Sequence, residues 1–428
     1  MKPWEANIRK VVPYTPGEQP NESGMIKLNT NENPYSPAPG VEKALKALDT
    51  DTLRLYPDPT AGDLVHSIAA FYGLKDEQVF TGVGSDDVLA MCFLTFFNSE
   101  KPILFPDITY SFYDVWADLF RIPYERPALD EEFHIRKEDY FRENGGIVFP
   151  NPNAPTGVEM PLSEIEEIVA KNPESIVIVD EAYVDFGATS ALPLIEKYDN
   201  LLVVRTFSKS RAMAGMRIGY AFGSKELIDA IKAVKFSYNS YTMNQATIET
   251  GVAAIKDDTY FKNIVSKIIE TRENAKKELK KLGFSFTDSK TNFIFATHER
   301  MPAKEIFEKL KKKNSMDAFA VSICKGLKMK VIDLKQSFII AFFFGAFQLM
   351  MPLIGYALSA SFVEYINKYS HWIAFVLLLV IGVNMIREAL GDSEEEKEVI
   401  ESVTDFKELF MLAIATSIDA LAVGDSFG

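Results

Sequence analysis

Short apolar runs alternate with longer amphipathic stretches over the first three quarters of the chain. The stretches Gly40 to Leu48 and Gly62 to Tyr72 have apolar residues at helical spacing. The runs with the length of buried strands are residues 78–81, 102–106, 146–150, 176–179 and 201–204. Alternation of strands and helices is typical of a mostly parallel sheet that is covered by helices. The pattern therefore predicts an α/β fold.

The pattern changes after about residue 314. Residues 337–363 contain no charged side chain, and residues 371–386 form a second uncharged run. A helix that crosses a bilayer needs about 20 apolar residues, so the first run predicts a membrane span. A buried core helix is the alternative, but such helices are usually shorter. We expect a partial all-α membrane domain over residues 315–428, joined to an α/β part.

Composition limits the kind of partner and compartment. The net charge of −14 argues against a nucleic-acid-binding surface. The two cysteines, Cys92 and Cys324, suit a reducing compartment without a disulfide framework. The N-terminal residues 1–5 lack the apolar core of a signal peptide. We therefore expect the α/β part in the cytoplasm.

A lysine that follows one of the apolar runs is the first chemical candidate. Lys209 comes shortly after Val204, which places it at the carboxyl edge of the predicted sheet, where α/β proteins bind ligands. Most lysines are solvated surface residues, but Ser208 and Arg217 add a hydroxyl and a guanidinium suited to one phosphate. An amine nucleophile beside a phosphate site suggests pyridoxal phosphate held as a Schiff base.

Two other strand ends carry polar residues. Asp180 follows the run 176–179 and could simply cap a helix. However, the pyridine nitrogen of pyridoxal needs a carboxylate to stay protonated, and Tyr183 lies about one helical turn further on. The glycine loop at residues 82–84 opens a predicted helix, whose N–H groups can bind an anion, although such loops also serve merely as turns.

Six ordered motifs carry a resemblance to a known family. They are Asn-Glu-Asn-Pro-Tyr at 31–35, Tyr-Pro-Asp-Pro at 56–59, Gly-Ser-Asp at 84–86, Asn-Pro-Asn-Ala-Pro-Thr-Gly at 151–157, Asp-Glu-Ala-Tyr at 180–183, and Ser-Lys at 208–209 with Arg-Ile-Gly at 217–219. Residues 5–314 thereby resemble the histidinol-phosphate aminotransferases, fold-type-I pyridoxal-phosphate enzymes of histidine biosynthesis. Each motif alone is weak, but six in order rarely agree by chance.

The resemblance implies roles for the matching residues. Lys209 would bind the cofactor and move a proton between Cα and C4′, Asp180 would pair with the ring nitrogen, and Tyr183 would bond the phenolic oxygen. The implied reaction converts histidinol phosphate and 2-oxoglutarate to imidazole-acetol phosphate and glutamate. Further implied cofactor-binding residues are Gly84, Ser85, Asp86, Tyr110, Asn153, Ser208, Arg217 and, across a homodimer interface, Tyr56.

The chain departs from this family at two places. Ala154 stands where an asparagine usually bonds the phenolic oxygen, so Asn153 is the expected substitute. The family-like sequence ends near Asn314, and no arginine occurs between Arg300 and Arg387 to clamp a substrate α-carboxylate. We therefore expect weaker transamination than in a complete relative. The resemblance divides the N-terminal part into an arm (1–30), a cofactor-binding large domain (31–275) and a truncated small domain (276–314).

A repeated motif characterises the membrane part. Ser-Met-Asp-Ala-Phe-Ala-Val at 315–321 recurs as Ser-Ile-Asp-Ala-Leu-Ala-Val at 417–423, which places Asp317 and Asp419 in register. A charge in lipid costs about 2.5–3.5 kcal/mol on insertion scales, so the repeated pair indicates function more than two helix caps. These residues resemble the manganese efflux pump family. The resemblance implies Asp317, Asp419 and Gln348 as metal ligands.

The topology of this part follows from its charges. Lysines between residues 325 and 335 predict a cytoplasmic loop. A complete span before this loop would put the catalytic part outside, but residues 315–326 reach only about 18 Å as a helix, too short to cross. The catalytic part is therefore expected in the cytoplasm, attached to the inner (plasma) membrane through residues 337–424. The family has six spans, and the part of this chain that resembles it is expected to start inside the first span and to end inside the fourth. Three interpretations compete: an aminotransferase with a membrane fragment, a divalent-cation transporter with an appendage, or a chimera with neither half fully active. The first best describes the encoded chemistry.

Overall fold

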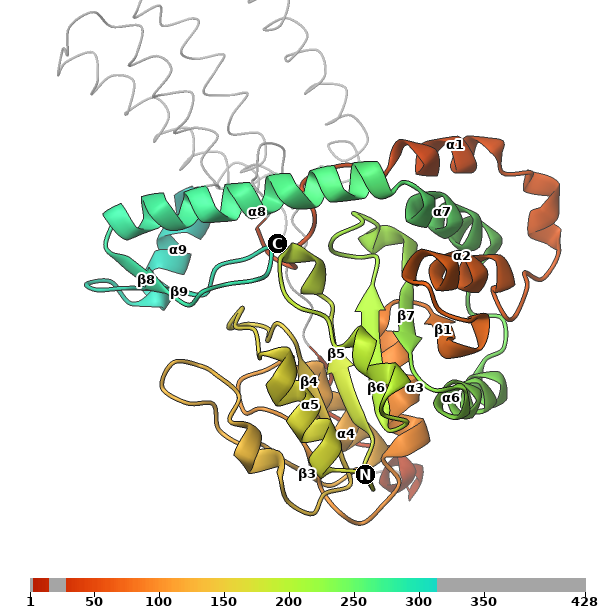
Figure 1. Cartoon of the computed structure of the whole chain (residues 1–428), viewed down its shortest axis with the longest axis horizontal. Helices are drawn as coiled ribbons and strands as arrows, with labels where there is room; N and C mark the ends of the chain where they lie inside the picture. Colours follow the sequence, from red (N-terminus) through yellow and green to blue (C-terminus); the bar gives the residue numbers. More distant parts are fainter. Residues whose placement is uncertain (1–2, 15–27, 314–428) are drawn as a thin grey trace, which may run out of the picture. The chain divides into compact units, whose positions relative to one another are not determined.

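The computed structural model describes residues 3–14 and 28–313 (Figure 1). The predictions for residues 315–428, including the ligands Asp317, Gln348 and Asp419, lie outside the described residues. Residues 3–14 and 28–303 belong to one compact unit, and a second begins at Lys304. Among the helices of the described ranges, none is long and apolar enough to cross a membrane.

A seven-stranded sheet forms the centre of the first unit, in the order β1-β7-β6-β5-β4-β2-β3. β7 runs antiparallel to the other six strands, so its pairs with β1 and β6 are antiparallel and the remaining pairs are parallel. The strands are β1 (Val79–Gly82), β2 (Ile103–Leu104), β3 (Tyr124–Glu125), β4 (Gly146–Pro150), β5 (Val177–Asp180), β6 (Leu201–Thr206) and β7 (Gly219–Phe222). The predicted mostly parallel sheet is confirmed, while β3 and β7 were not predicted.

Helices precede, separate and follow the strands. They are α1 (Pro39–Ala47), α2 (Gly62–Tyr72), α3 (Ser85–Phe96), α4 (Phe112–Phe120), α5 (Leu162–Lys171), α6 (Lys225–Tyr238), α7 (Gln245–Lys256), α8 (Asp258–Lys281) and α9 (Ala303–Lys313). Short 3-10 helices are η1 (Pro3–Asn7), η2 (Thr50–Arg54), η3 (Asp76–Gln78), η4 (Lys137–Tyr140), η5 (Val184–Phe186), η6 (Leu192–Glu196) and η7 (Ala214–Met216). In Figure 1, α8 runs from α7 to the antiparallel hairpin of β8 (Phe284–Phe286) and β9 (Ala296–His298).

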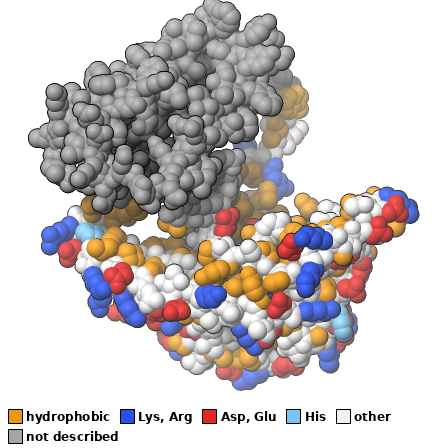
Figure 2. All heavy atoms as spheres, turned by 90° about the horizontal axis from the view of Figure 1, so that it is seen from above, with side chains coloured by type: hydrophobic (Ala, Val, Ile, Leu, Met, Phe, Trp, Pro, Cys, Tyr) orange, Lys and Arg blue, Asp and Glu red, His pale blue; other side chains and the backbone are white. Residues whose placement is uncertain are grey.

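The sheet has a hydrophobic core on each face. Val177 and Val179 of β5 belong to one cluster of buried residues, and Ile178 between them belongs to the other. Strands buried on both faces need apolar residues at every position, which explains the uninterrupted runs in the sequence. On the face shown in Figure 2, Lys and Arg side chains are interspersed with Asp and Glu side chains over the described part.

Strand register brings the ends of the central strands together. Pro150 of β4 pairs with Asp180 of β5, and Asp180 pairs with Val204 of β6. Thr206, the last residue of β6, pairs with Gly219 of β7. The loops that follow β4, β5 and β6 therefore leave the sheet at one edge.

Candidate active site at the carboxyl ends of the strands

A cavity of about 1080 Å³ lies at this edge of the sheet. Most of the residues that the sequence singled out line it: Ser85, Asp86, Tyr110, Asp180, Tyr183, Ser208, Lys209 and Arg217. They come from segments that follow β1, β2, β5 and β6, together with the last residue of β5. The predicted convergence of strand ends therefore occurs in the structure. Gly84, Asn153 and Tyr56 are not among the lining residues.

Asp180 places a buried carboxyl group in the cavity wall. Its oxygens accept hydrogen bonds from the Tyr113 hydroxyl at 3.0 Å and from the Ala182 N–H at 3.1 Å. Burial raises the pKa of Asp180 to about 6, although both bonds favour the charged form. This carboxyl group can therefore hold or release a proton near neutral pH, or pair with a cationic ring nitrogen.

Tyr183 lies three residues after the end of β5, as the N-cap of η5. Its hydroxyl accepts a hydrogen bond from Asn31 Nδ2 at 3.1 Å, and its ring contacts the Phe293 ring edge-on with centroids 5.0 Å apart. Burial raises the pKa of Tyr183 to about 12. The phenol therefore stays protonated at neutral pH and can donate a hydrogen bond to a ligand.

Lys209 is the amine of the cavity. Its Nζ donates to the Thr30 carbonyl at 2.6 Å and lies 5.5 Å from the centroid of the Tyr183 ring. Burial lowers the pKa of Lys209 to about 8, so a much larger fraction of the amine is neutral at pH 7 than for an ordinary lysine. Asn33 Nδ2 holds the backbone by donating to the Lys209 carbonyl at 2.9 Å. These features suit a nucleophilic amine.

The N-terminus of α3 forms one side of the cavity. Gly84, with φ of 90°, is the N-cap of α3, and Arg217 is packed so closely that a Cβ on Gly84 would lie 2.5 Å from Nη2. The first N–H groups of a helix have no partner within the helix and attract anions. With the Ser208 hydroxyl and the Arg217 guanidinium on the same cavity, the arrangement fits a phosphate group.

Asp86 holds the surrounding side chains in place. It accepts a hydrogen bond from the Tyr110 hydroxyl at 2.8 Å, and its other oxygen lies 3.2 Å from Arg217 Nη2. Burial, followed by the nearby Asp86 charge, raises the pKa of Tyr110. The Tyr110 ring packs edge-on against Tyr113, with centroids 5.7 Å apart. The hydrogen bond to Asp86 and the edge-on contact with Tyr113 fix the orientation of the Tyr110 ring. A flat aromatic ligand can therefore stack on the face of this ring.

Two predicted residues lie elsewhere. The buried Asn153 amide donates to the Ile108 carbonyl at 2.9 Å and to Thr156 Oγ1 at 3.1 Å, whereas Ala154 lines the cavity. The amide that reaches the Tyr183 hydroxyl belongs to Asn31, which the sequence did not assign. The expected bond from Asn153 to the cofactor's phenolic oxygen stays a prediction. Tyr56 is 81% exposed, and its ring packs against Tyr241.

Several cavity residues were not assigned from the sequence. Tyr14 lines the cavity and stacks on Phe112 with centroids 4.2 Å apart. Asn31 belongs to a motif that was noticed, but nothing in that motif indicates a contact with Tyr183. Phe293 carries no sequence signal. In the part of the chain that the structure describes, no group of three or more His, Cys, Asp and Glu residues could hold a metal ion.

The donor set fits pyridoxal phosphate. The cavity combines a neutralisable amine, a buried carboxyl group, a phenol and an anion-binding helix N-terminus around a stackable ring, which are the groups that this cofactor requires. The glycines allow this crowding, because a Cβ on Gly219 would lie 2.2 Å from the carbonyl carbon of Gly84.

Comparisons with known proteins agree with this geometry. Residues 23–325 match the family described as "Aminotransferase class I and II", and residues 331–428 match "Putative manganese efflux pump". The histidinol-phosphate aminotransferase of Lactococcus lactis subsp. cremoris (strain MG1363) is 53% identical over 307 residues, which are 72% of this chain and 86% of the relative. That of Brachyspira hyodysenteriae is 51% identical over 71% of this chain and 86% of its own length. Both resemblances drawn from the motifs are thus confirmed.

Solved structures show the same fold. The histidinol-phosphate aminotransferase from Clostridium acetobutylicum has a TM-score of 0.60 and 24% identity, covering 66% of this chain and 87% of its own. The Sinorhizobium meliloti enzyme, in complex with pyridoxal-5'-phosphate, has a TM-score of 0.58 and 24% identity, covering 63% of this chain and 75% of its own.

Proposed function

Since this chain belongs to the class I and II aminotransferases, we propose that its cavity binds pyridoxal phosphate on Lys209 and transfers the amino group of histidinol phosphate to 2-oxoglutarate. The observation that carries the proposal is the meeting of the half-buried Lys209 amine with the buried Asp180 carboxyl group in one cavity. The identity of about 50% to several histidinol-phosphate aminotransferases supports the substrate.

The chain's own residues supply position and protonation. When bound, the cofactor supplies an electron sink for the negative charge that develops at the substrate Cα. Asp180 would hold a charge against the ring nitrogen, and the Tyr183 hydroxyl would donate to the phenolic oxygen. The helix N-terminus at Ser85, with Ser208 and Arg217, would hold the phosphate. The Lys209 amine, with its pKa lowered to about 8 by burial, would take and return the Cα proton.

The test is Lys209→Ala in the full chain. The variant should lose the visible absorbance of bound cofactor that borohydride fixes covalently, and transamination of histidinol phosphate should fall to background. Lys235→Met is the matched control, because burial also lowers the pKa of Lys235, yet its Nζ donates to the carbonyls of Pro59 and Thr81. Retained covalent capture in Lys209→Ala would refute the assignment.

The same assay addresses the strength of the reaction. Because no arginine occurs between Arg300 and Arg387 to hold an α-carboxylate, we expect kcat/KM for 2-oxoglutarate to be at least tenfold lower than for the Lactococcus lactis relative. Equal values for the two proteins would show that another group of this chain orients the α-carboxylate of 2-oxoglutarate.

We further propose a homodimer. Two segments carry exposed apolar side chains: η2 and the loop after it, and α6 and the loop after it. The segments contact each other through the rings of Tyr56 and Tyr241. These side chains are Leu53, Leu55, Tyr56, Phe236, Tyr238 and Tyr241. Apolar groups gathered in this way favour a protein interface. In the dimer, Tyr56 would reach the phosphate of the neighbouring subunit's cofactor.

We also propose that residues 331–428 attach the chain to the inner membrane, with the catalytic part in the cytoplasm. The match to the efflux pump family and the uncharged run 337–363 support this. The full chain should stay with membranes after alkaline extraction, whereas a chain that ends at residue 314 should be released. Release of both would refute the attachment. Manganese efflux is the alternative function of this segment, and it predicts rescue of an efflux-deficient strain in high manganese.

A further inference from the structure

The segment of residues 287–293, between β8 and β9, borders the cavity through Phe293. Three other cavity segments hold it. The Lys290 N–H donates to the Gly157 carbonyl at 2.9 Å, Asn292 Nδ2 donates to the Asn31 carbonyl at 3.0 Å, and the Phe293 ring contacts the Tyr183 ring. We name this segment the bridging segment, because it joins loops that are far apart in the sequence.

The bridging segment has a fixed internal shape. Ser289 and Thr291 are completely buried, and both hydroxyls donate to the Phe293 carbonyl, at 2.6 Å and 3.1 Å. The hydroxyls also lie 2.9 Å from each other. Buried polar networks that are well satisfied rigidify a structure. Movement at Thr291 is therefore transmitted to Phe293.

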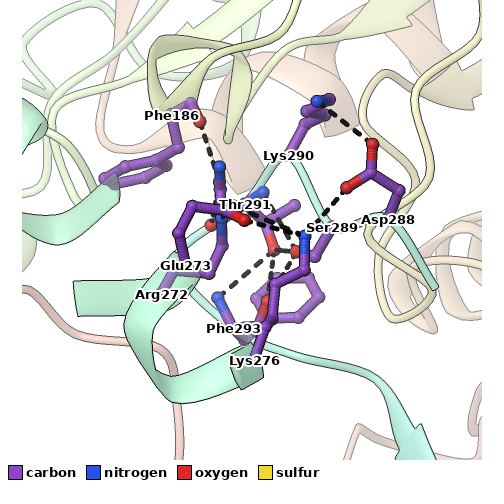
Figure 3. Close-up of polar contacts among 9 residues, drawn as sticks. All are labelled: Phe186, Arg272, Glu273, Lys276, Asp288, Ser289, Lys290, Thr291 and Phe293. Atoms are coloured by element: carbon purple, nitrogen blue, oxygen red, sulfur yellow. Dashed lines mark hydrogen bonds and ion pairs between the residues drawn. The ribbon is translucent and has the colours of Figure 1, made fainter. Parts of the chain in front are cut away.

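Arg272 of α8 binds the bridging segment through its backbone (Figure 3). Its side chain is 6% exposed, and its Nη1 donates to the carbonyls of Thr291 and Phe186, both at 2.9 Å. Phe186 ends η5, the short helix that begins after Tyr183. One guanidinium nitrogen thus ties the turn after Tyr183 to the segment that carries Phe293.

We propose that Arg272 is a positioning residue for the Tyr183 hydroxyl, an inference that rests on the proposed role of Tyr183 in binding the cofactor. Tyr183 is held on one side by the Phe293 ring and on the other by Asn31, whose carbonyl is held in turn by Asn292. Both holding groups depend on the bridging segment. Without the Arg272 bonds, the turn and the bridging segment are free to separate, and the hydroxyl loses its fixed direction.

Asp288, on the solvent side of the bridging segment, provides a control. Asp288 has a side chain that is 72% exposed and forms ion pairs with Lys276 at 2.8 Å and Lys290 at 3.2 Å. Ion pairs whose carboxylate lies in solvent contribute little, because water and salt screen the charge. Asp288→Asn therefore alters the bridging segment on its solvent side without touching the two carbonyls that Arg272 binds.

The experiment compares Arg272→Met, Arg272→Lys, Asp288→Asn and Tyr183→Phe in the full chain. The readouts are the pH midpoint of the visible absorbance of bound cofactor, kcat and KM separately, and the melting temperature. Arg272→Met should move the pH midpoint in the same direction as Tyr183→Phe and lower kcat about tenfold or more, with KM within about twofold. Arg272→Lys should lie between wild type and Arg272→Met, and Asp288→Asn should match wild type.

A double variant separates positioning from general stability. If Arg272 acts through Tyr183, adding Arg272→Met to Tyr183→Phe should change kcat and the pH midpoint no further. If the role of Arg272 is purely structural, Arg272→Met lowers the melting temperature but leaves the pH midpoint at the wild-type value. In the double variant, its loss of kcat then multiplies with that of Tyr183→Phe. These results would overturn the proposal. A Tyr183→Phe variant equal to wild type would overturn the proposed role of Tyr183 itself. If Arg272→Met does not fold, the pH midpoint of Arg272→Lys tests the proposal: a midpoint shifted toward that of Tyr183→Phe supports it, and the wild-type midpoint overturns it.

Discussion

Gly219→Ala tests whether the close approach of β7 to α3 builds the phosphate site. A Cβ at this position would lie 2.2 Å from the Gly84 carbonyl carbon, 2.3 Å from the Ser85 nitrogen and 2.4 Å from the Gly84 carbonyl oxygen. All three are backbone atoms at the start of α3, so no side-chain rotation can relieve the contact. The first residue of β7 and the N-terminus of α3 must therefore move apart.

The size of the movement sets the expected cost. Non-bonded carbon atoms are most stable about 3.5–4.0 Å apart, so the backbone has to shift by more than about 1 Å. Overpacking commonly costs about 1–3 kcal/mol, and the upper end applies where backbone must move. For a domain of this size, about 3 kcal/mol lowers the melting temperature by about 5 °C. A shift of about 1 Å also breaks charge-assisted hydrogen bonds to the phosphate, which raises the Kd for pyridoxal phosphate about 10- to 100-fold.

The assay is a cofactor titration by absorbance together with melting curves in the presence and absence of pyridoxal phosphate. Gly40→Ala is the matched control, because a Cβ there meets only Ala253, at 3.6 Å and beyond, and alanine suits a helix better than glycine. Its melting temperature should stay equal or rise. If Gly219→Ala melted within about 1 °C of wild type and bound the cofactor within about twofold, the reasoning from close approach would be refuted.

Two further predictions concern Lys209 and the apolar patch. Burial lowers the pKa of Lys209 to about 8, and only the neutral amine attacks the cofactor. The rate of cofactor capture, measured by stopped-flow absorbance, should therefore rise about tenfold per pH unit up to pH 8 and then level off. A rate that continues to rise to pH 10 would contradict this prediction. Leu55→Asp should convert the proposed dimer to a monomer, as measured by light scattering. Leu282→Asp changes a similarly exposed apolar residue on another element and should leave the dimer intact. A dimeric Leu55→Asp protein would exclude this interface.

The sequence by itself identified the central strands and most of the site. Parallel strands that are buried on both faces need unbroken apolar runs, and their carboxyl ends meet at one edge because the strands share a direction. The positions of Lys209 and Asp180 just past two such runs therefore predict that they lie together. Ser208 and Arg217 were proposed as phosphate ligands because a hydroxyl and a guanidinium lie near Lys209 in the sequence, and the fold places all four residues on one cavity.

Tertiary structure alone decided which side chain holds the Tyr183 hydroxyl. Asn153 bonds Thr156 within its own loop, a short-range contact, and also donates to the Ile108 carbonyl, 45 residues away. Asn31 is 152 residues from Tyr183, so their contact depends on how distant loops pack over the sheet. The same is true of Arg272, which looks like any charged helix residue in the sequence. Only the packed α8 turns its guanidinium inward, to the carbonyls of Phe186 and Thr291.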